Sequence, residues 1–166
     1  ELDITTTKLK SWDVANTSFV SPAYNYVKTI LQDDKGMLWI GFWGGGLARL
    51  NPISKKIEHW RNETENLESL SYNDVWEICQ DNKGRIWIGT NGGGLNLFNE
   101  DKQNSFFHWR ADKKNKNGLN SNNIYTICEA VNANNSNDQT ILWVGTANGL
   151  NKLIINDELK NLQMLR

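Results

Sequence analysis

Two histidines are the side chains best suited to acid–base chemistry, because an imidazole titrates near neutral pH. They occur as His59-Trp60-Arg61 and His108-Trp109-Arg110, 49 residues apart, and so occupy equivalent places in a repeating pattern. Each is expected on the last strand of its own repeat, at an outer edge and far from the other. Nothing in the sequence marks a nucleophile with its base. The sequence therefore predicts no catalytic residue.

Two acidic segments, Asp33-Asp34-Lys35-Gly36 and Asp81-Asn82-Lys83-Gly84, cluster carboxylates that could attract calcium. An EF-type loop, however, needs many more oxygen ligands at fixed spacing. Each segment lies between two apolar runs, where an aspartate accepts hydrogen bonds from turn amides and a glycine adopts positive φ. We expect hairpin turns here, and no metal.

Two glycine triplets, Gly44-Gly45-Gly46 and Gly92-Gly93-Gly94, expose backbone amides of the kind that cradle phosphate. Neither triplet is followed by Lys-Ser or Lys-Thr, and each precedes a strand-like run, so the helix that phosphate sites use is missing. Both triplets are interpreted as glycine-rich turns, and no cofactor is expected.

These segments belong to an internal repeat. Residues 30–41 align with residues 78–89 at an offset of 48, and a third copy, 141–150, follows at an offset of 56. An Asn/Ser-rich insertion, 132–139, accounts for the extra length. In the second unit, four strand-like runs are separated by turns: 75–80, 85–90, 95–99 and 105–110. Four short strands per unit of this length are typical of a β-propeller blade.

We therefore predict an all-β chain of four-stranded antiparallel β-propeller blades, about 3 to 3.5 blades of a partial propeller. Residues 21–68, 69–117 and 118–166 form the three blades, and residues 1–20 supply outer strands of a preceding blade. The chain begins Glu1-Leu2 without a methionine or a signal peptide, which we interpret as a mature or excised fragment.

Tryptophan and glycine mark the expected core. Trp39, Trp87 and Trp143 each stand among aliphatic residues, so their rings are predicted to fill the space between neighbouring blades. The glycine two residues after each tryptophan would leave room for a ring of the next blade. Cys79 and Cys128 occupy equivalent positions, where we expect small buried side chains and no disulfide.

Composition excludes two classes of partner. The net charge of −1, with Lys and Arg scattered along the chain, gives no basic face for nucleic acid. No apolar stretch approaches the roughly 20 residues that span a bilayer, so no membrane contact is expected from this segment.

A ligand site is predicted at one face of the blades. The turn between the second and third strands lies at the same face as the link into the next blade, and the residues that differ between repeats gather there. Aromatic rings mixed with Asn suit neutral polar ligands such as sugars, although the same residues could instead cap strands and close turns. The candidate ligand-binding residues are Trp43, Phe42, Tyr24, Tyr72, Asn73, Asn91, Asn122 and Asn123.

Residues 32–41 (Gln-Asp-Asp-Lys-Gly-Met-Leu-Trp-Ile-Gly) and 80–95 resemble the two-component regulator propeller repeat. That family builds propeller sensor regions of hybrid histidine kinases in gut Bacteroidetes. The resemblance implies a periplasmic location, a role in signalling, and recognition of oligosaccharides released from polysaccharides. A closed propeller of this type needs about six or seven blades, so either the remaining blades or a second copy of the chain is expected as a partner.

Three functions follow from this interpretation. The first is a ligand-sensing module that binds small oligosaccharides without turnover. The second is a protein–protein interaction propeller that uses a broad face. A lyase or hydrolase ranks last, because the first-strand positions are mostly Asn and aliphatic, without the clustered His, Tyr, Arg or carboxylates that such an enzyme needs.

Overall fold

The structure is a computed structural model, and it describes residues 26–102, 105–115, 118–130, 139–156 and 163–165. The outer strands expected in residues 1–20, the candidate Tyr24, and the inserted loop up to residue 138 lie outside these residues. Gln139, the last residue of the expected insertion, begins a strand.

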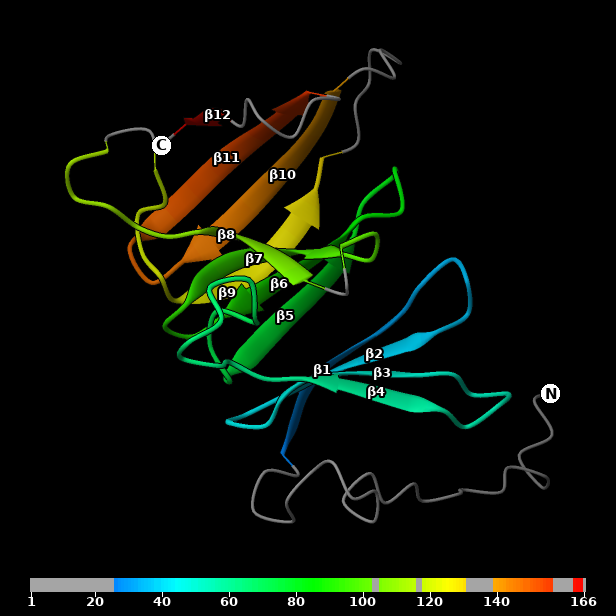
Figure 1. Cartoon of the computed structure of the whole chain (residues 1–166). Coiled ribbons are helices and arrows are strands. Elements are labelled where there is room, and N and C mark those ends of the chain that lie inside the picture. Colours follow the sequence, from blue (N-terminus) through cyan, green and yellow to red (C-terminus); the bar gives the residue numbers. More distant parts are fainter. Residues whose placement is uncertain (1–25, 103–104, 116–117, 131–138, 157–162, 166) are drawn as a thin grey trace, which may run out of the picture.

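Three four-stranded antiparallel sheets make up the described chain, and its residues include no helix. The first sheet contains β1 (Val27–Gln32), β2 (Leu38–Phe42), β3 (Gly46–Leu50) and β4 (Ile57–Trp60). The second contains β5 (Val75–Gln80), β6 (Ile86–Thr90), β7 (Gly94–Asn99) and β8 (Ser105–Trp109). The third contains β9 (Ile124–Glu129), β10 (Gln139–Thr146), β11 (Gly149–Asn156) and β12 (Gln163–Leu165) (Figure 1). Each sheet is a propeller blade with its strands in chain order, which confirms the predicted fold class.

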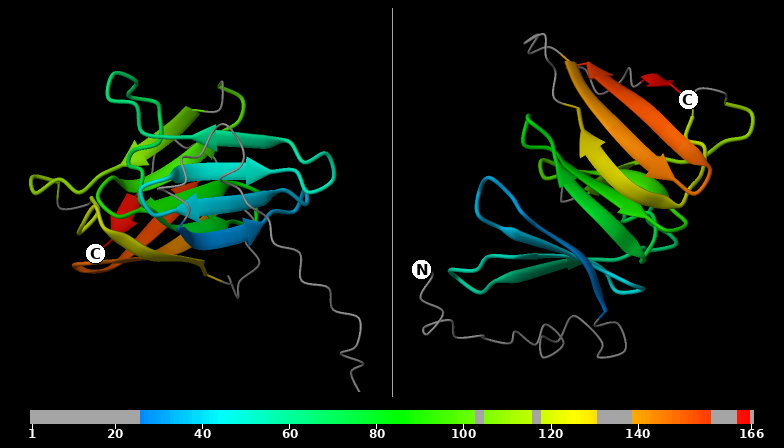
Figure 2. Two further views of the ribbon diagram at one scale, coloured as in Figure 1. Left: turned by 90° about the horizontal axis from the view of Figure 1, so that it is seen from below. Right: turned by 180° about the vertical axis from the view of Figure 1, so that it is seen from behind.

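The blades are packed side by side through their first strands. β1 lies beside β5, and β5 lies beside β9, while the later strands of each sheet diverge (Figure 2). The first strands β1, β5 and β9 therefore form the inner edge of the three packed blades, where strands line the centre of a propeller.

Each acidic turn is tied to the tryptophan that follows it. Asp81 accepts hydrogen bonds at Oδ1 from the amides of Lys83 and Arg85, both at 3.0 Å. Its Oδ2 accepts the Trp87 indole N–H at 2.8 Å. Asp33 makes the same three contacts in the first blade, including a 2.7 Å bond from the Trp39 indole. One buried carboxylate thus closes the hairpin and satisfies the polar atom of the core ring.

Hydrophobic clusters fill the space between successive blades. Trp39 is buried with residues of the second blade, and Trp87 with residues of the third. This confirms the predicted inter-blade role for these two rings. The linkers add one fully buried leucine to each cluster, Leu70 and Leu119.

The glycines after these tryptophans leave room for aliphatic side chains, and the expectation of a ring there was wrong. A Cβ at Gly41 would lie 2.5 Å from Val75 Cγ1, and one at Gly89 would lie 2.7 Å from Ile124 Cγ2. Both partners are β-branched residues at the start of the next blade's first strand. Each glycine therefore lets neighbouring inner strands approach closely.

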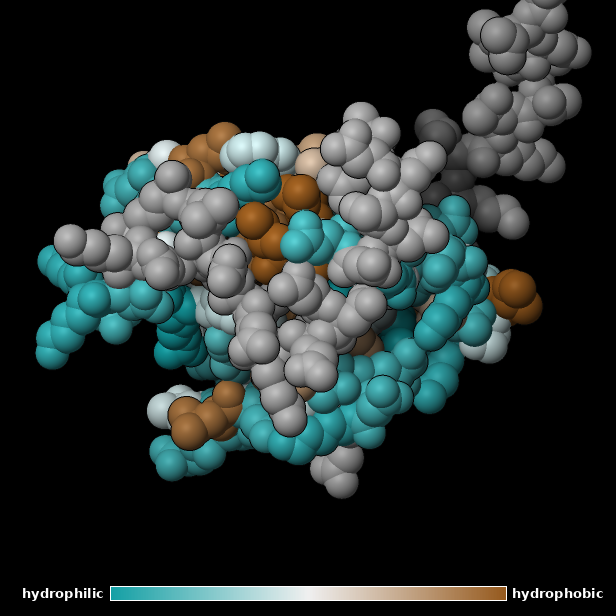
Figure 3. All heavy atoms as spheres, turned by 90° about the horizontal axis from the view of Figure 1, so that it is seen from above, coloured by the Kyte–Doolittle hydropathy of each residue, from teal (hydrophilic) through white to brown (hydrophobic). Residues whose placement is uncertain are grey.

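The third blade departs from the expectation. Trp143 is 38% exposed and Leu150 is 54% exposed, whereas their equivalents Trp87 and Leu95 are fully buried. Cys128 is also exposed, although Cys79 packs against the core between the second and third blades. The reason is common to all three: these side chains lie on the face that a following blade would cover, and no such blade is among the described residues. The space-filling view over the third blade shows hydrophobic side chains at the surface among hydrophilic ones (Figure 3).

Polar contacts repeat between the blades as well. The Gln80 side chain and Asp34 exchange two hydrogen bonds, with Gln80 Nε2 donating to Asp34 Oδ1 at 2.8 Å and the Asp34 amide donating to Gln80 Oε1 at 2.9 Å. At the next interface the Asn82 amide donates to Glu129 Oε2 at 3.0 Å. The inner strand of each blade therefore holds the first turn of the blade before it, which fixes the relative position of the inner strands.

Candidate functional site

The site is built on an irregularity shared by the three inner strands. Pairing with the second strand skips one residue in each blade, because the register shifts between Val27 and Thr29, between Val75 and Glu77, and opposite Gly145 and Thr146. The extra residues occupy the same position of the repeat. They are Lys28, Trp76 and Tyr125. A β-bulge redirects a side chain away from the strand's regular alternation, and bulges are frequent beside functional sites.

These three side chains form a continuous row from blade to blade. The Trp76 and Tyr125 rings are stacked, with centroids 5.2 Å apart and an interplanar angle of 22°. The Lys28 Nζ lies 5.2 Å from the Trp76 ring centroid, on the side of the first blade. A cation at this distance is attracted by the electron-rich face of the indole.

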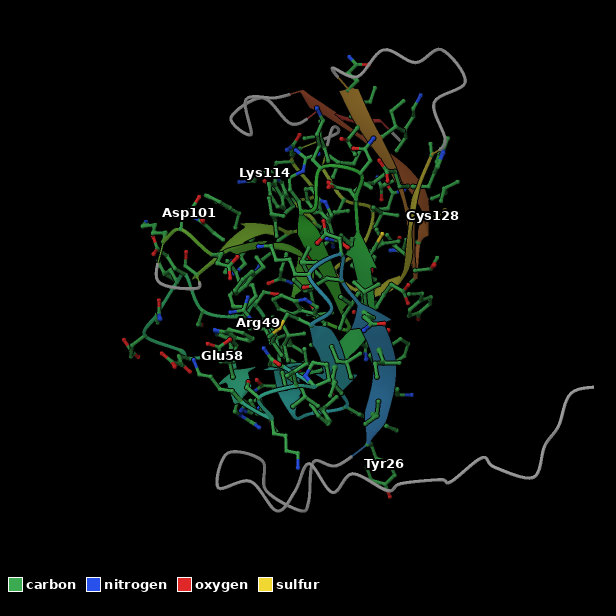
Figure 4. All side chains as sticks on the ribbon, turned by 90° about the vertical axis from the view of Figure 1, so that its right-hand side faces the viewer. Tyr26, Arg49, Glu58, Asp101, Lys114 and Cys128 are labelled. Carbon is green, nitrogen blue, oxygen red and sulfur yellow. The ribbon has the colours of Figure 1, made fainter. Side chains whose placement is uncertain are left out.

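Two further aromatic residues extend the row at the start of β1. The Trp43 ring lies 4.8 Å from Lys28 Nζ, and its centroid is 6.4 Å from that of Tyr26 in an edge-on arrangement. The Trp43 amide donates to the Tyr26 carbonyl at 2.9 Å, which holds the two residues together. Tyr26 directly precedes β1, the first blade's inner strand (Figure 4). We call Tyr26, Trp43, Lys28, Trp76 and Tyr125 the inner row.

The inner row is open to solvent along much of its length. Tyr26 is 71% exposed, Trp43 is 55% exposed and Tyr125 is 48% exposed. Trp76 is half-buried, and its indole N–H is buried without an acceptor among the described residues. Exposed rings on one edge of a protein, next to a cation, are elements of a polar-ligand site.

Of the predicted site residues, Trp43 belongs to this row and Phe42 does not. Phe42 is fully buried with Ile40, Ala48 and Leu50, on the side of the first blade that faces away from the second. It therefore presents no ring to a ligand. The two neighbours point in different directions, because Phe42 is the last residue of β2 and Trp43 is the first residue of the turn.

The predicted asparagines Asn73 and Asn122 hold the links between blades. Asn73 Oδ1 accepts the Asn62 amide at 2.8 Å, and Asn122 Oδ1 accepts the Ala111 amide at 2.6 Å. Their carbonyls accept the Gly46 and Gly94 amides of the glycine turns. These contacts match the capping alternative that the sequence left open.

Asn91, Asn123 and Tyr72 also lie at the end of the blades that carries the glycine turns. Asn91 and Asn123 form a β-bridge between the second and third blades, and the Asn123 carbonyl accepts the Ala147 amide at 3.0 Å. Tyr72 is 47% exposed, and a Cβ on Gly92 would lie 3.2 Å from its ring. Tyr72 is therefore available at the surface, with its ring against the glycine turn.

The two histidines have structural partners. His59 Nε2 is 2.7 Å from the Gly45 carbonyl, and His108 Nε2 is 2.7 Å from the Ser69 carbonyl. Burial lowers the pKa of both imidazoles. Within the described ranges, no three side chains of His, Cys, Asp or Glu are grouped so that they could hold a metal ion.

Several ion pairs lie on or next to the outer strands, away from the inner row. Arg49 forms ion pairs with Glu58 at 2.6 Å and Glu100 at 2.7 Å, and Figure 4 shows Arg49 and Glu58 close together. A hollow of about 630 Å³ between the outer strands of the first two blades is lined by residues that include His59, Glu68 and Lys102. Glu68 and Lys102 are themselves an ion pair, and no residue of the inner row lines this hollow.

A family model for the two-component regulator propeller matches residues 21–44 and 69–92. These two segments are similar to the two-component regulator propeller repeat. They contain the acidic turns, the tryptophans Trp39 and Trp87, Trp43, and the bulge residues Lys28 and Trp76. The resemblance seen in the sequence is thereby confirmed. No curated protein matches the chain.

Solved structures share the fold. One, described as the extracellular domain of a hybrid two-component system from B. thetaiotaomicron, is 22% identical, with a TM-score of 0.63 over 86% of this chain. A second such extracellular domain from the same organism is 23% identical, with a TM-score of 0.58 over 76% of this chain. The chain covers only 18% and 15% of those structures, respectively. At this identity the likeness concerns the propeller fold.

Sequence reasoning missed Tyr26, Lys28, Trp76 and Tyr125. The signal was present, since residues 28, 76 and 125 stand in one column of the repeat. Simple alternation gives no reason to single out that column, and only the bulge makes its members neighbours across blades.

Proposed function

We propose that this chain is part of the extracytoplasmic sensor region of a two-component signalling protein, and that its inner row binds a small oligosaccharide. The propeller repeats support the signalling role, and the likeness to extracellular domains supports the location. No helix in the described part of the chain has the length and apolar character needed to cross a bilayer.

The inner row is the observation that carries the ligand proposal. Sugar rings stack on aromatic faces through their C–H groups, while their hydroxyls need directed hydrogen-bond partners. Trp43 and Tyr125 supply exposed rings, and the exposed Lys28 ammonium supplies a hydrogen-bond donor. The row crosses all three blades, so a ligand several sugar units long could contact each inner strand.

Binding without turnover is part of the proposal. The histidines are engaged with backbone carbonyls on outer strands, and the inner row contains no carboxylate or imidazole. Glycoside hydrolysis ordinarily uses a pair of carboxyl groups flanking the scissile bond. The row therefore supplies contacts for recognition and none of the usual groups for cleavage.

The proposal is tested by the melting temperature of the chain in the presence of glycan-derived oligosaccharides. A ligand that binds only the folded state raises the melting temperature as its concentration increases. At a ligand concentration of 100 times Kd, the folded state is stabilised by about 2.7 kcal/mol. Trp43→Ala should abolish this rise. Phe107→Ala is the matched control, because Phe107 is 43% exposed on an outer strand and lies outside the row.

The outcomes separate two functions. A rise that is lost in Trp43→Ala and kept in Phe107→Ala supports oligosaccharide sensing at the inner row. An equal loss in both variants, or no rise with any oligosaccharide, argues against it and favours a protein–protein interaction propeller.

A further inference from the structure

We propose that the inner row selects an anionic saccharide, one that carries a carboxylate or a sulfate group, and that the Lys28 ammonium binds that group. The inference rests on the proposed function and names the chemical class of its ligand. Its starting point is the unusual position of one lysine between two indole rings.

Lys28 lies near two indole rings, whereas Lys152 lies over one, that of Trp143 at 5.7 Å, and Lys35 and Lys56 are ion-paired. Lys35 pairs with Glu100 at 3.1 Å, and Lys56 pairs with Glu58 at 3.3 Å. Lys28 is exposed, and its Nζ contacts the Trp43 and Trp76 rings at 4.8 and 5.2 Å. No carboxylate among the described residues forms an ion pair with it.

The two glutamates of the described inner strands, Glu77 and Glu129, are directed away from Lys28 or bonded to another residue. Glu77 follows Trp76 on β5, but its Cβ faces Gly89, on the side of the third blade. Burial raises the pKa of the Glu77 carboxyl, whereas a neighbouring ammonium would lower it. Glu129, at the end of β9, accepts the Asn82 amide. The Lys28 charge is therefore not neutralised by either glutamate.

This arrangement favours an anion in two ways. The indole rings displace part of the water around the ammonium and hold the lysine stem in place, which reduces the entropy lost when a ligand binds. An anionic group then forms a charge-assisted hydrogen bond, which is stronger than one to a neutral hydroxyl. A sugar ring carrying that group can lie on the exposed part of Trp43.

The experiment compares ligands that differ only in charge. Isothermal titration of the chain with trigalacturonate and with its fully methyl-esterified form presents the same three rings with and without carboxylates. A sulfated galactose trisaccharide distinguishes sulfate from carboxylate as the source of the charge. We expect at least one anionic probe to bind about tenfold more tightly than the neutral ester. A tenfold difference in Kd corresponds to about 1.4 kcal/mol of binding free energy.

Variants at position 28 identify the residue responsible. Lys28→Met keeps the aliphatic stem against the rings, and it should remove the tenfold preference for the anionic probe. Lys28→Arg should retain the preference. Circular dichroism and the melting temperature of each variant establish that the blades remain folded.

Each outcome bears on a different claim. Binding of the anionic probe with loss of preference in Lys28→Met supports the inference. Equal affinity for both anionic probes and the neutral ester, unaffected by Lys28→Met, overturns the inference and leaves oligosaccharide sensing intact. Absence of binding by every saccharide overturns both proposals.

Discussion

The two acidic turns allow a quantitative test, because they differ in one contact. Asp33 and Asp81 each accept two turn amides and one indole N–H. Asp81 also accepts a hydrogen bond from Arg85 Nε at 2.7 Å, in an ion pair whose side chains are 0% exposed for Asp81 and 19% exposed for Arg85. The equivalent of Arg85 in the first blade is Met37.

We therefore expect Asp81→Asn to lower the free energy of unfolding more than Asp33→Asn does. Asp33→Asn keeps one oxygen for the amides but leaves the buried Trp39 N–H facing an NH₂ group, a cost of about 1–3 kcal/mol. Asp81→Asn has the same cost for Trp87 and also loses the charge-assisted bond from Arg85, which adds about 1.5–3 kcal/mol. Urea unfolding with an unchanged m-value measures the difference.

A third variant isolates the contribution of the arginine. Arg85→Met makes the second turn resemble the first, and in that background Asp81→Asn should cost no more than Asp33→Asn does. The reasoning is refuted if Asp33→Asn destabilises the chain as much as Asp81→Asn, or if Arg85→Met leaves the cost of Asp81→Asn unchanged.

Three further variants or labels probe the packing and ionisation of the inner strands. Gly89→Ala places a Cβ 2.7 Å from Ile124 Cγ2 and should cost about 1–3 kcal/mol by overpacking. In a double-mutant cycle with Ile124→Ala the combined loss should be smaller than the sum of the single losses, and additive losses would contradict the contact. Iodoacetamide at pH 8 should modify the exposed Cys128 before Cys79, because burial raises the pKa of the Cys79 thiol to about 11. Peptide mass spectrometry reports the order of modification, and faster labelling of Cys79 would be inconsistent with its burial. Burial raises the pKa of Glu77, so the folded state binds that proton more tightly than the unfolded state does, and stability falls as the pH rises through the folded pKa. Glu77→Gln should accordingly raise the urea midpoint at pH 7 and change it little below the ordinary carboxyl pKa, whereas a gain that does not depend on pH would exclude this cause.

Much of the fold could be predicted from the repeat itself. The acidic turn, the core tryptophan and the glycine turn recur at fixed places of the repeat, and the hydrogen bonds that close the acidic turn are local to each blade. The antiparallel four-stranded order follows from short turns between strand-like runs. Trp39 and Trp87 accordingly lie where the pattern placed them.

The features that could not be predicted depend on contacts between blades. The burial of Trp143 and Cys128 was expected from their equivalence to Trp87 and Cys79, but burial requires a covering blade. The size of the side chain opposite Gly41 depends on how close the next inner strand lies. The burial of a side chain and the size of its neighbour are tertiary properties, which cannot be inferred from a residue's position in the repeat.

The candidate site was predicted only in part, for a similar reason. Trp43 was found because it differs from its equivalents, Asn91 and Ala147. Asn73 and Asn122 were also selected, although identical residues at matching positions are what a shared structural bond requires, and the structure shows that bond. Lys28, Trp76 and Tyr125 become neighbours only through the bulges, which shift the register of three strands at the same place.

The indole N–H signals in a ¹H–¹⁵N spectrum test the central claim most directly. The chain has eight tryptophans, and their indole signals can be assigned by single substitutions. A bound oligosaccharide should shift the signals of Trp43 and Trp76, which belong to the inner row. The signals of Trp39 and Trp87 should stay in place, because their N–H groups are buried and bonded to Asp33 and Asp81. Shifts at the core tryptophans without change at Trp43 and Trp76 would contradict a binding site at the inner row.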